Sequence, residues 1–263
     1  MKIASLNLGF NVMSNLILGS EGIFVEKCQL KYPTNLGWAN DSKKLSMCSK
    51  NSAKFLSSYD IFGLQEVNKT YQEVFQKTIQ NYKPEKKFKF ISSSYFSNGA
   101  IVIGYDENVL GKGYAVTKNM KLSHGKDERA IQAAWFPKKS LLFLNLHAPH
   151  KANLKQLIEE RCSEIALHLI KNKIYPVRVI MVGDFNDYKG DLLNKVIEVF
   201  GKRLRLPNAK IPKTCCADNG YKLVGDYILD SKREYIYFGT PKNYDRDISL
   251  YSDHDPIVLV TDL

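Results

Sequence analysis

The chain has 263 residues, 44% of them hydrophobic and 25% charged, with a formal net charge of +11. This composition excludes a fibrous or low-complexity chain, and no apolar run approaches the about 20 residues that a membrane-spanning helix needs. The positive charge favours polyanionic partners, either nucleic acid or an anionic membrane surface. No repeat and no Gly/Ser/Pro-rich linker marks a boundary, so we expect a single domain over residues 1–263.

The N-terminus and the cysteines indicate a reducing compartment. The sequence enters a strand pattern directly after Met1, without the apolar core and small-residue cleavage site of a signal peptide. We therefore expect an intracellular protein, cytoplasmic or nuclear. The cysteines form no CxxC pair and are odd in number, so neither a zinc site nor a full disulfide framework is expected. We interpret all five as reduced: Cys28, Cys48, Cys162, Cys215 and Cys216.

Short apolar runs and helical periodicities alternate along the chain. In chain order they predict a strand at 2–8, a helix at 41–57, a strand at 61–67, a helix at 68–80, strands at 99–105, 129–136 and 141–147, a helix at 152–173, and strands at 176–183, 222–229, 233–238 and 256–262. Some successive strands are joined by helices and others by turns, which favours sheets with both parallel and antiparallel pairs. The predicted fold class is α/β, a four-layer sandwich of two packed mixed β-sheets flanked by helices.

Polar side chains lie at or near the ends of several apolar runs. They are Asn7, Glu66, His147, Asp184 with Asn186, Asp226, and Asp253 with His254. Taken singly, each has an ordinary structural explanation as a cap, a turn residue or a hydrogen-bonded core histidine. Groups at strand ends of an α/β sheet converge in one crevice, however. Together they would bind a hard divalent cation through oxygen and supply proton-transfer groups beside it.

The order of these motifs resembles the endonuclease/exonuclease/phosphatase superfamily, which includes DNase I. The matching pieces are "SLNLG", "GLQEV", "ERAIQAAW", "LNLHAPH", "GDFND", "GDYIL" and "SDHDPI", and they span essentially the whole chain. The resemblance implies a DNase I-like fold and metal-dependent hydrolysis of phosphate esters. Abasic endonucleases of the family generally carry Tyr where this chain has His147, so the chain looks more like the DNase I, phosphatase and tyrosyl-phosphodiesterase branches.

The resemblance also implies a role for each motif residue. Metal binding, by Mg²⁺ with Mn²⁺ as a possible substitute, is implied for Asn7, Glu66 and Asp253. Catalytic roles are implied for His147, Asp184, Asn186, Asp226 and His254, and phosphate binding for Arg129. In this scheme Asp226 orients His254 beside the scissile phosphate, while Asp184 and Asn186 position or activate the attacking water. Whether Asp184 or His254 is the base, and whether one metal or two are bound, stays open.

Two stretches are rich in basic residues. Residues 200–222 include Arg203, Arg205, Lys210 and Lys213, which either border a nucleic-acid groove or form a solvated loop. Residues 83–90 form a second cluster, which we interpret as a solvated turn.

The expected function is that of a monomeric Mg²⁺-dependent phosphodiesterase, a nuclease or nucleic-acid end-processing enzyme acting on DNA or RNA. One alternative is an enzyme for phosphoinositides or another small phosphoester, because the same catalytic set serves both. A second, from another class, is a catalytically silent binding protein with the same fold.

Overall fold

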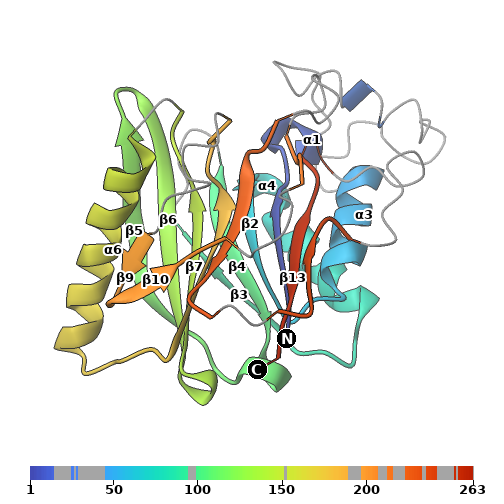
Figure 1. Ribbon diagram of the computed structural model, residues 1–263. Helices are drawn as coiled ribbons and strands as arrows, with labels where there is room; N and C mark the ends of the chain where they lie inside the picture. The colour runs from blue at the N-terminus through green and yellow to red at the C-terminus, as the bar shows by residue number, and fades with distance from the viewer. Residues whose placement is uncertain are drawn as a thin grey trace.

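The computed structural model describes residues 1–14, 25–26, 28, 45–93, 99–150, 153–188, 197–206, 212–215, 223–232, 235–241, 252 and 254–262. Two β-sheets lie face to face at its centre (Figure 1). In spatial order, the first sheet contains β12 (Tyr237–Gly239), β13 (Ile257–Val260), β1 (Lys2–Asn7), β2 (Ile61–Val67), β4 (Ala100–Asp106) and β3 (Phe88–Ser92). The second contains β11 (Asp226–Asp230), β8 (Arg178–Asp184), β7 (Leu141–His147), β6 (Asp127–Phe136) and β5 (Tyr114–His124). A short hairpin, β9 (Ile197–Val199) and β10 (Lys202–Leu204), forms a separate two-stranded sheet that packs in the core between the second sheet and helix α6 (Leu154–Lys171).

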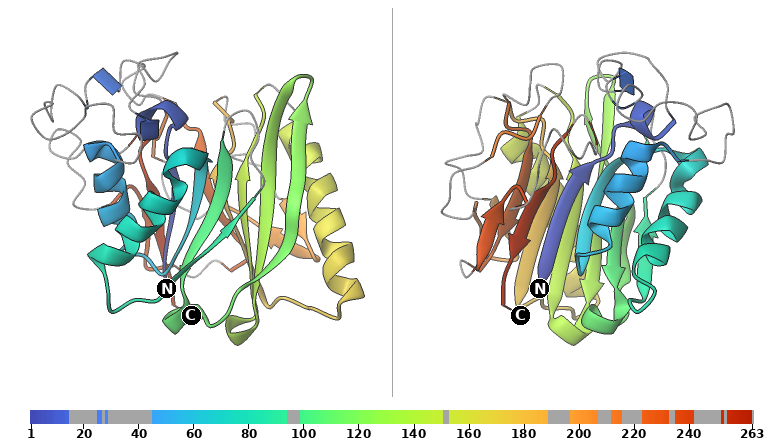
Figure 2. Two further views of the ribbon diagram at one scale, coloured as in Figure 1. Left: turned by 180° about the vertical axis from the view of Figure 1, so that it is seen from behind. Right: turned by 90° about the vertical axis from the view of Figure 1, so that its right-hand side faces the viewer.

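Helices cover the outer faces of both sheets, as the two views of Figure 2 show. The first sheet carries α3 (Met47–Leu56) and α4 (Lys69–Tyr82), and the second carries α6 (Leu154–Lys171). Shorter helices are α1 (Phe10–Ser14), α5 (Glu107–Leu110) and a 3₁₀ turn at Pro137–Lys139. The predicted four-layer α/β sandwich with mixed sheets is confirmed. Of the helices in the described ranges, none is long and apolar enough to cross a membrane.

Three separate hydrophobic cores fill the spaces between the four layers. One lies between the first sheet and α3 and α4, one between the two sheets, and one between the second sheet and α6. Within each strand, alternate side chains enter different cores, as the two-residue period of a strand requires. In β1, Ile3 enters the inter-sheet core whereas Ala4 and Leu6 face the helices.

The same alternation carries polar residues into the space between the sheets. Asn145 of β7 is fully buried and accepts a hydrogen bond from Gln65 Nε2 of β2 at 2.7 Å. It donates to the carbonyl oxygens of Leu64 and Val102 at 3.0 and 3.1 Å, both in the opposite sheet. Gly63 leaves the room for this side chain, because a Cβ there would lie 2.6 Å from Asn145 Oδ1. One amide thus ties the two sheets together.

Four strands were missed by the sequence prediction: β3, β5, β9 and β10. Strand β3 overlaps residues 83–90, so the solvated-turn interpretation is wrong from Phe88 onward. The stretch interpreted as a basic loop from residue 200 begins instead with strand β10.

The cysteine prediction is also corrected. Cys28 and Cys48 form a disulfide, and Cys215 is disulfide-bonded as well. Of the described cysteines only Cys162 is free, and burial raises the pKa of its thiol to about 12. Cys216 lies outside the described residues. Cys28 and Cys48 are 20 residues apart in the sequence, so no short motif predicts the pair, and they meet through the packing around α3.

Candidate active site

The polar strand-end residues converge at one edge of the sandwich. Strands β1 and β2 are parallel, as are β7 and β8, so the ends at Asn7 and His147 lie on the same edge as Asp184. Antiparallel β11 begins at that edge, with Asp226 directly opposite Asp184 in the register. The alternation that sends Ile228 and Val182 into the inter-sheet core sends Asp226 and Asp184 to the same side. The fold therefore gathers residues that lie far apart in the sequence.

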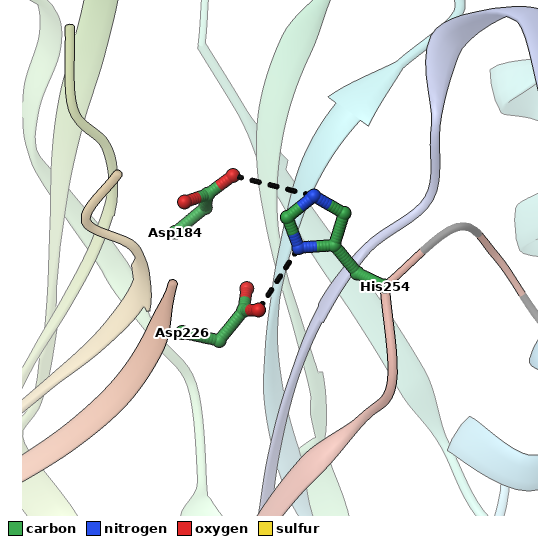
Figure 3. Close-up of side chains that lie close together, drawn as sticks. All are labelled: Asp184, Asp226 and His254. Atoms are coloured by element: carbon green, nitrogen blue, oxygen red, sulfur yellow. Dashed lines mark hydrogen bonds and ion pairs between the residues drawn. The ribbon is translucent and has the colours of Figure 1, made fainter. Parts of the chain in front are cut away.

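His254 lies between two carboxylates (Figure 3). Its Nδ1 is 2.9 Å from Asp226 Oδ2, within hydrogen-bonding distance, and its Nε2 is 3.8 Å from Asp184 Oδ2. All three side chains are buried. The short contact with Asp226 fixes the ring orientation and leaves Nε2 directed toward Asp184.

Burial sets the protonation behaviour of this group. Desolvation raises the pKa of Asp184 to about 6, and Asp226 adds to the rise, while His254 and hydrogen bonds from Asn186 and Asn7 oppose it. Desolvation lowers the pKa of His147 well below its usual value, and Arg129 lowers it further. At neutral pH His147 is therefore uncharged, and its Nε2, 3.6 Å from Glu66 Oε1, forms no ion pair.

A backbone irregularity turns Glu66 toward this group. Strict alternation along β2 would place Gln65 between the sheets and Glu66 on the helix side. The register against β4 shifts between Leu64 and Val67, however, and Glu66 has φ 55°, which is uncommon for a residue other than Gly. Its carboxylate then accepts hydrogen bonds from Asn7 Nδ2 at 3.1 Å and from the Phe10 backbone at 3.1 Å.

Asn7 connects the carboxylates of Glu66 and Asp184. Its Nδ2 donates to Asp184 Oδ2 at 3.0 Å as well as to Glu66, and its Oδ1 accepts from the Gly9 backbone at 3.0 Å. Two carboxylate oxygens thus converge beside an amide and the neutral ring of His147. This oxygen-rich, net-negative set suits a hard divalent cation such as Mg²⁺. Asp184, Asp226 and His254 form a second group with metal-ligating atoms within 4.8 Å of one another, and Asp184 belongs to both groups.

Arg129 belongs to a neighbouring cluster on β6. Its Nε lies 3.3 Å from Asp127 Oδ1, and the other oxygen of Asp127 accepts a 2.8 Å hydrogen bond from the His150 backbone. Burial alone would raise the pKa of Asp127, but the hydrogen bonds from His150 and the charge of Arg129 lower it. Arg129 is adjacent to Ala130, which pairs with His147, and the charge of Arg129 acts on the His147 ring, so Arg129 lies near this end of the second sheet.

The basic residues expected at a groove are separated in the structure. Arg205 pairs with Asp230 at the far end of β11, four residues from Asp226, which is roughly 13 Å at 3.3 Å per residue. Arg203 and Arg205 line a cavity of about 490 Å³ with Lys202 and Lys232. Exposed Lys213 instead precedes Thr214, whose hydroxyl accepts from the Asp226 backbone at 3.2 Å. Of the expected site residues, Lys210 and Asp253 lie outside the described part of the chain.

Three residues that contact the site residues or connect their segments were not predicted from the sequence. Thr214 O accepts from the Asp255 backbone at 2.8 Å, so Thr214 connects the segment around Asp226 to the one around His254. Cys215 Sγ lies 3.5 Å from His254 Nε2. Tyr188 donates to Asn186 Oδ1 at 2.5 Å. Of the three, only Tyr188 could have been suspected from the sequence, because it follows Asn186 by two residues in "GDFNDY".

Comparison with solved structures identifies the fold. An endonuclease/exonuclease/phosphatase family protein from Bacteroides thetaiotaomicron has a TM-score of 0.60 at 18% identity, covering 100% of this chain and 98% of that chain. The chain has the endonuclease/exonuclease/phosphatase fold. The same fold occurs in TDP2 from D. rerio, solved with a single-strand DNA product, with a TM-score of 0.53 at 14% identity over 100% and 99% of the two chains.

A third protein with this fold carries a different printed activity. A mannosyl-6-phosphatase from Bacteroides thetaiotaomicron has a TM-score of 0.53 at 18% identity, covering both chains in full. No family model matches the sequence. A search of curated proteins gave no significant match. At these identities the endonuclease/exonuclease/phosphatase fold is what the chain shares with its neighbours.

Proposed function

We propose that this protein is a divalent-metal-dependent phosphodiesterase. The observation that carries the proposal is His254 held by Asp226 on one side and facing Asp184 on the other, beside the carboxylate of Glu66. This arrangement combines a proton-transfer pair with an oxygen-rich cation set, which phosphate-ester hydrolysis requires. The catalytic roles go to Asp184, Asn186, Asp226, His254 and His147.

In this mechanism Asp184 accepts the proton of the attacking water. Its raised pKa of about 6 lies near neutral pH, where a general base is effective. His254, oriented by Asp226, places Nε2 at the phosphate, and Arg129 and neutral His147 contribute donors to phosphate oxygens. Glu66 and Asn7, with Asp253 from the sequence resemblance, would hold Mg²⁺ or Mn²⁺, which would supply Lewis-acid polarisation of the phosphate.

Nucleic acid is the proposed substrate class. The net charge of +11 favours a polyanion, and TDP2 shares the fold and was solved with single-strand DNA. The mannosyl-6-phosphatase supports the second candidate, a small phosphoester.

A substrate panel separates these candidates. The protein is assayed with Mg²⁺ or Mn²⁺ against single- and double-stranded DNA, RNA, 5′-tyrosyl DNA, phosphoinositides and sugar phosphates. Faster turnover of a nucleic acid supports the first proposal, and faster turnover of a small monoester supports the second. Binding without turnover of any of them contradicts both and favours a silent binding protein.

A further inference from the structure

The Asn186 side chain is held by hydrogen bonds that fix which way its amide faces. Asn186 Nδ2 donates to the Ala148 carbonyl at 2.7 Å, and its backbone N–H donates to Asp184 Oδ1 at 2.9 Å. The residue has φ 49°, a left-handed conformation that Asn tolerates better than most residues. Asn186 is 8% exposed, so an amide hydrogen that makes no hydrogen bond within the protein has little access to solvent.

The Tyr188 hydroxyl completes this arrangement. It donates to Asn186 Oδ1 at 2.5 Å, which takes one lone pair of the amide oxygen and fixes the orientation of the amide. Tyr188 approaches closely because Gly225 lacks a side chain; a Cβ there would lie 3.3 Å from the Tyr188 ring and 3.6 Å from Asp184 Oδ1. An amide nitrogen carries two hydrogens, and Ala148 takes one. Among the described residues, the second has no acceptor.

We propose that Tyr188 is a positioning residue that makes Asn186 a hydrogen-bond donor to a phosphoryl oxygen of the substrate. The hydrogen bonds at Oδ1 and Nδ2 fix which way the amide faces, so Asn186 is assigned the donor role and Asp184 the activation of the attacking water. The inference rests on the proposed phosphoesterase function and assigns a part of it to a residue outside the family motifs found in the sequence. A donor aimed at charge that develops on the phosphoryl oxygen stabilises the transition state more than the ground state.

The test is Tyr188→Phe, with Tyr227→Phe as a matched control. Tyr227 is in β11, and its hydroxyl donates to Asp187 Oδ2 at 3.1 Å, so the control removes a tyrosine hydroxyl that contacts the same loop without touching Asn186. With a model diester, Tyr188→Phe should lower kcat by about 10-fold with little change in KM or in the pH profile. The control should keep its kcat. Equal losses in the two variants would overturn the proposal.

A double variant and a spectroscopic measurement complete the design. In an Asn186→Ala background, Tyr188→Phe should cause no further loss, because Tyr188 acts through Asn186; multiplying defects would contradict this. The Asn186 side-chain amide signals, assigned by their absence in Asn186→Ala, should shift and exchange faster with solvent in Tyr188→Phe. Unchanged signals would overturn the positioning role even if the parent protein hydrolyses nothing, an outcome that by itself contradicts only the proposed function.

Discussion

At the scale of single residues, Glu66 has a backbone conformation that is uncommon for a residue other than Gly. Its positive φ and the register shift beside it bring a carboxylate to the site edge that regular alternation would direct elsewhere. Strained conformations of this kind persist where the surrounding structure holds them and are concentrated at functional sites. Asn7 and the Phe10 backbone hold the carboxylate in place.

Glu66→Gln keeps the shape of the side chain and removes the charge that a divalent cation needs. We expect activity to fall by about two orders of magnitude or more, with the thermal midpoint nearly unchanged. The control is Glu73→Gln on α4, where the carboxylate is exposed and pairs with Lys77. Turnover by the parent should also stop in EDTA and return with Mg²⁺, and full turnover in excess EDTA would contradict metal dependence.

Asp226 and His254 should behave as one unit. If Asp226 acts by orienting the ring, Asp226→Asn and His254→Ala lower kcat by similar factors, and the double variant is no slower than His254→Ala alone. Steady-state kinetics of the four proteins measure this directly. Independent, multiplying losses would mean that the 2.9 Å contact does not serve catalysis.

The raised pKa of Asp184 predicts a pH-dependent stability. The folded state holds the proton up to about pH 6, whereas the unfolded chain releases it near 3.8, so this carboxyl destabilises the fold increasingly as pH rises through that window. Relative to the parent, Asp184→Asn should therefore gain stability between about pH 4 and pH 7, by on the order of 2 kcal/mol. Urea unfolding with EDTA at several pH values measures the difference. A gain that does not vary with pH would contradict the raised pKa.

At the scale of elements, the basic residues expected at a groove lie at opposite ends of β11, one lysine at its start and two arginines at its end. Exposed Lys213 lies near Asp226, while Arg203 and Arg205 line the cavity beside Asp230. The Asp230 carboxylate is itself paired with Arg178 at the start of β8. A substrate that crosses only the site edge would contact Lys213 and would not reach Arg203 or Arg205.

This separation predicts different salt effects for two variants. Lys213→Ser should raise KM for a long nucleic acid and lower its salt slope by about 0.7–0.9, the value for one phosphate contact, yet leave a small diester unaffected. The double variant Arg203→Ser with Arg205→Ser should change the KM for long nucleic acid and its salt slope much less. Kinetics across a salt series test this. A larger effect of the arginine pair would mean that nucleic acid extends along β11 to the cavity.

The sequence predicted those elements whose burial is uniform. Strands β2 and β7 match their predicted bounds, because each is a continuous apolar run that ends in a polar side chain. Strand β5 was missed because its alternation is broken at "TKNM", where its register against β6 shifts twice. The ends of the motif strands do meet at one edge, because strand direction brings them there. The bulge that turns Glu66 and the contact of Tyr188 with Asn186 depend on packing between segments, which no local pattern encodes.

At the scale of the whole molecule, the two sheets are joined by polar contacts as well as by their apolar core. Asn145→Leu should lower the free energy of unfolding by about 2–4 kcal/mol, because it removes the acceptor of the 2.7 Å hydrogen bond from Gln65 Nε2 and the donor to the carbonyls of Leu64 and Val102. Gln132 lies opposite Asn145 on β6, is equally buried, and its side chain makes no hydrogen bond within the described structure. Gln132→Leu should therefore be neutral or stabilising. Urea unfolding of the two variants measures the difference. Similar losses of stability for both would show that the cost comes from fitting a leucine side chain between the sheets and not from lost hydrogen bonds.

The position of β1 between β2 and β13 has a consequence for synthesis on the ribosome. Its partners on one side come from residues 61–65 and on the other from 257–260, so β1 remains an open edge until residues 257–260 have been made. Every strand of the second sheet precedes that point. His254 is made just before β13, and the step that closes the exposed edge of β1 also brings the proposed catalytic histidine to Asp226. Nascent chains shorter than this would carry a finished second sheet, an edge open to mispairing, and no activity.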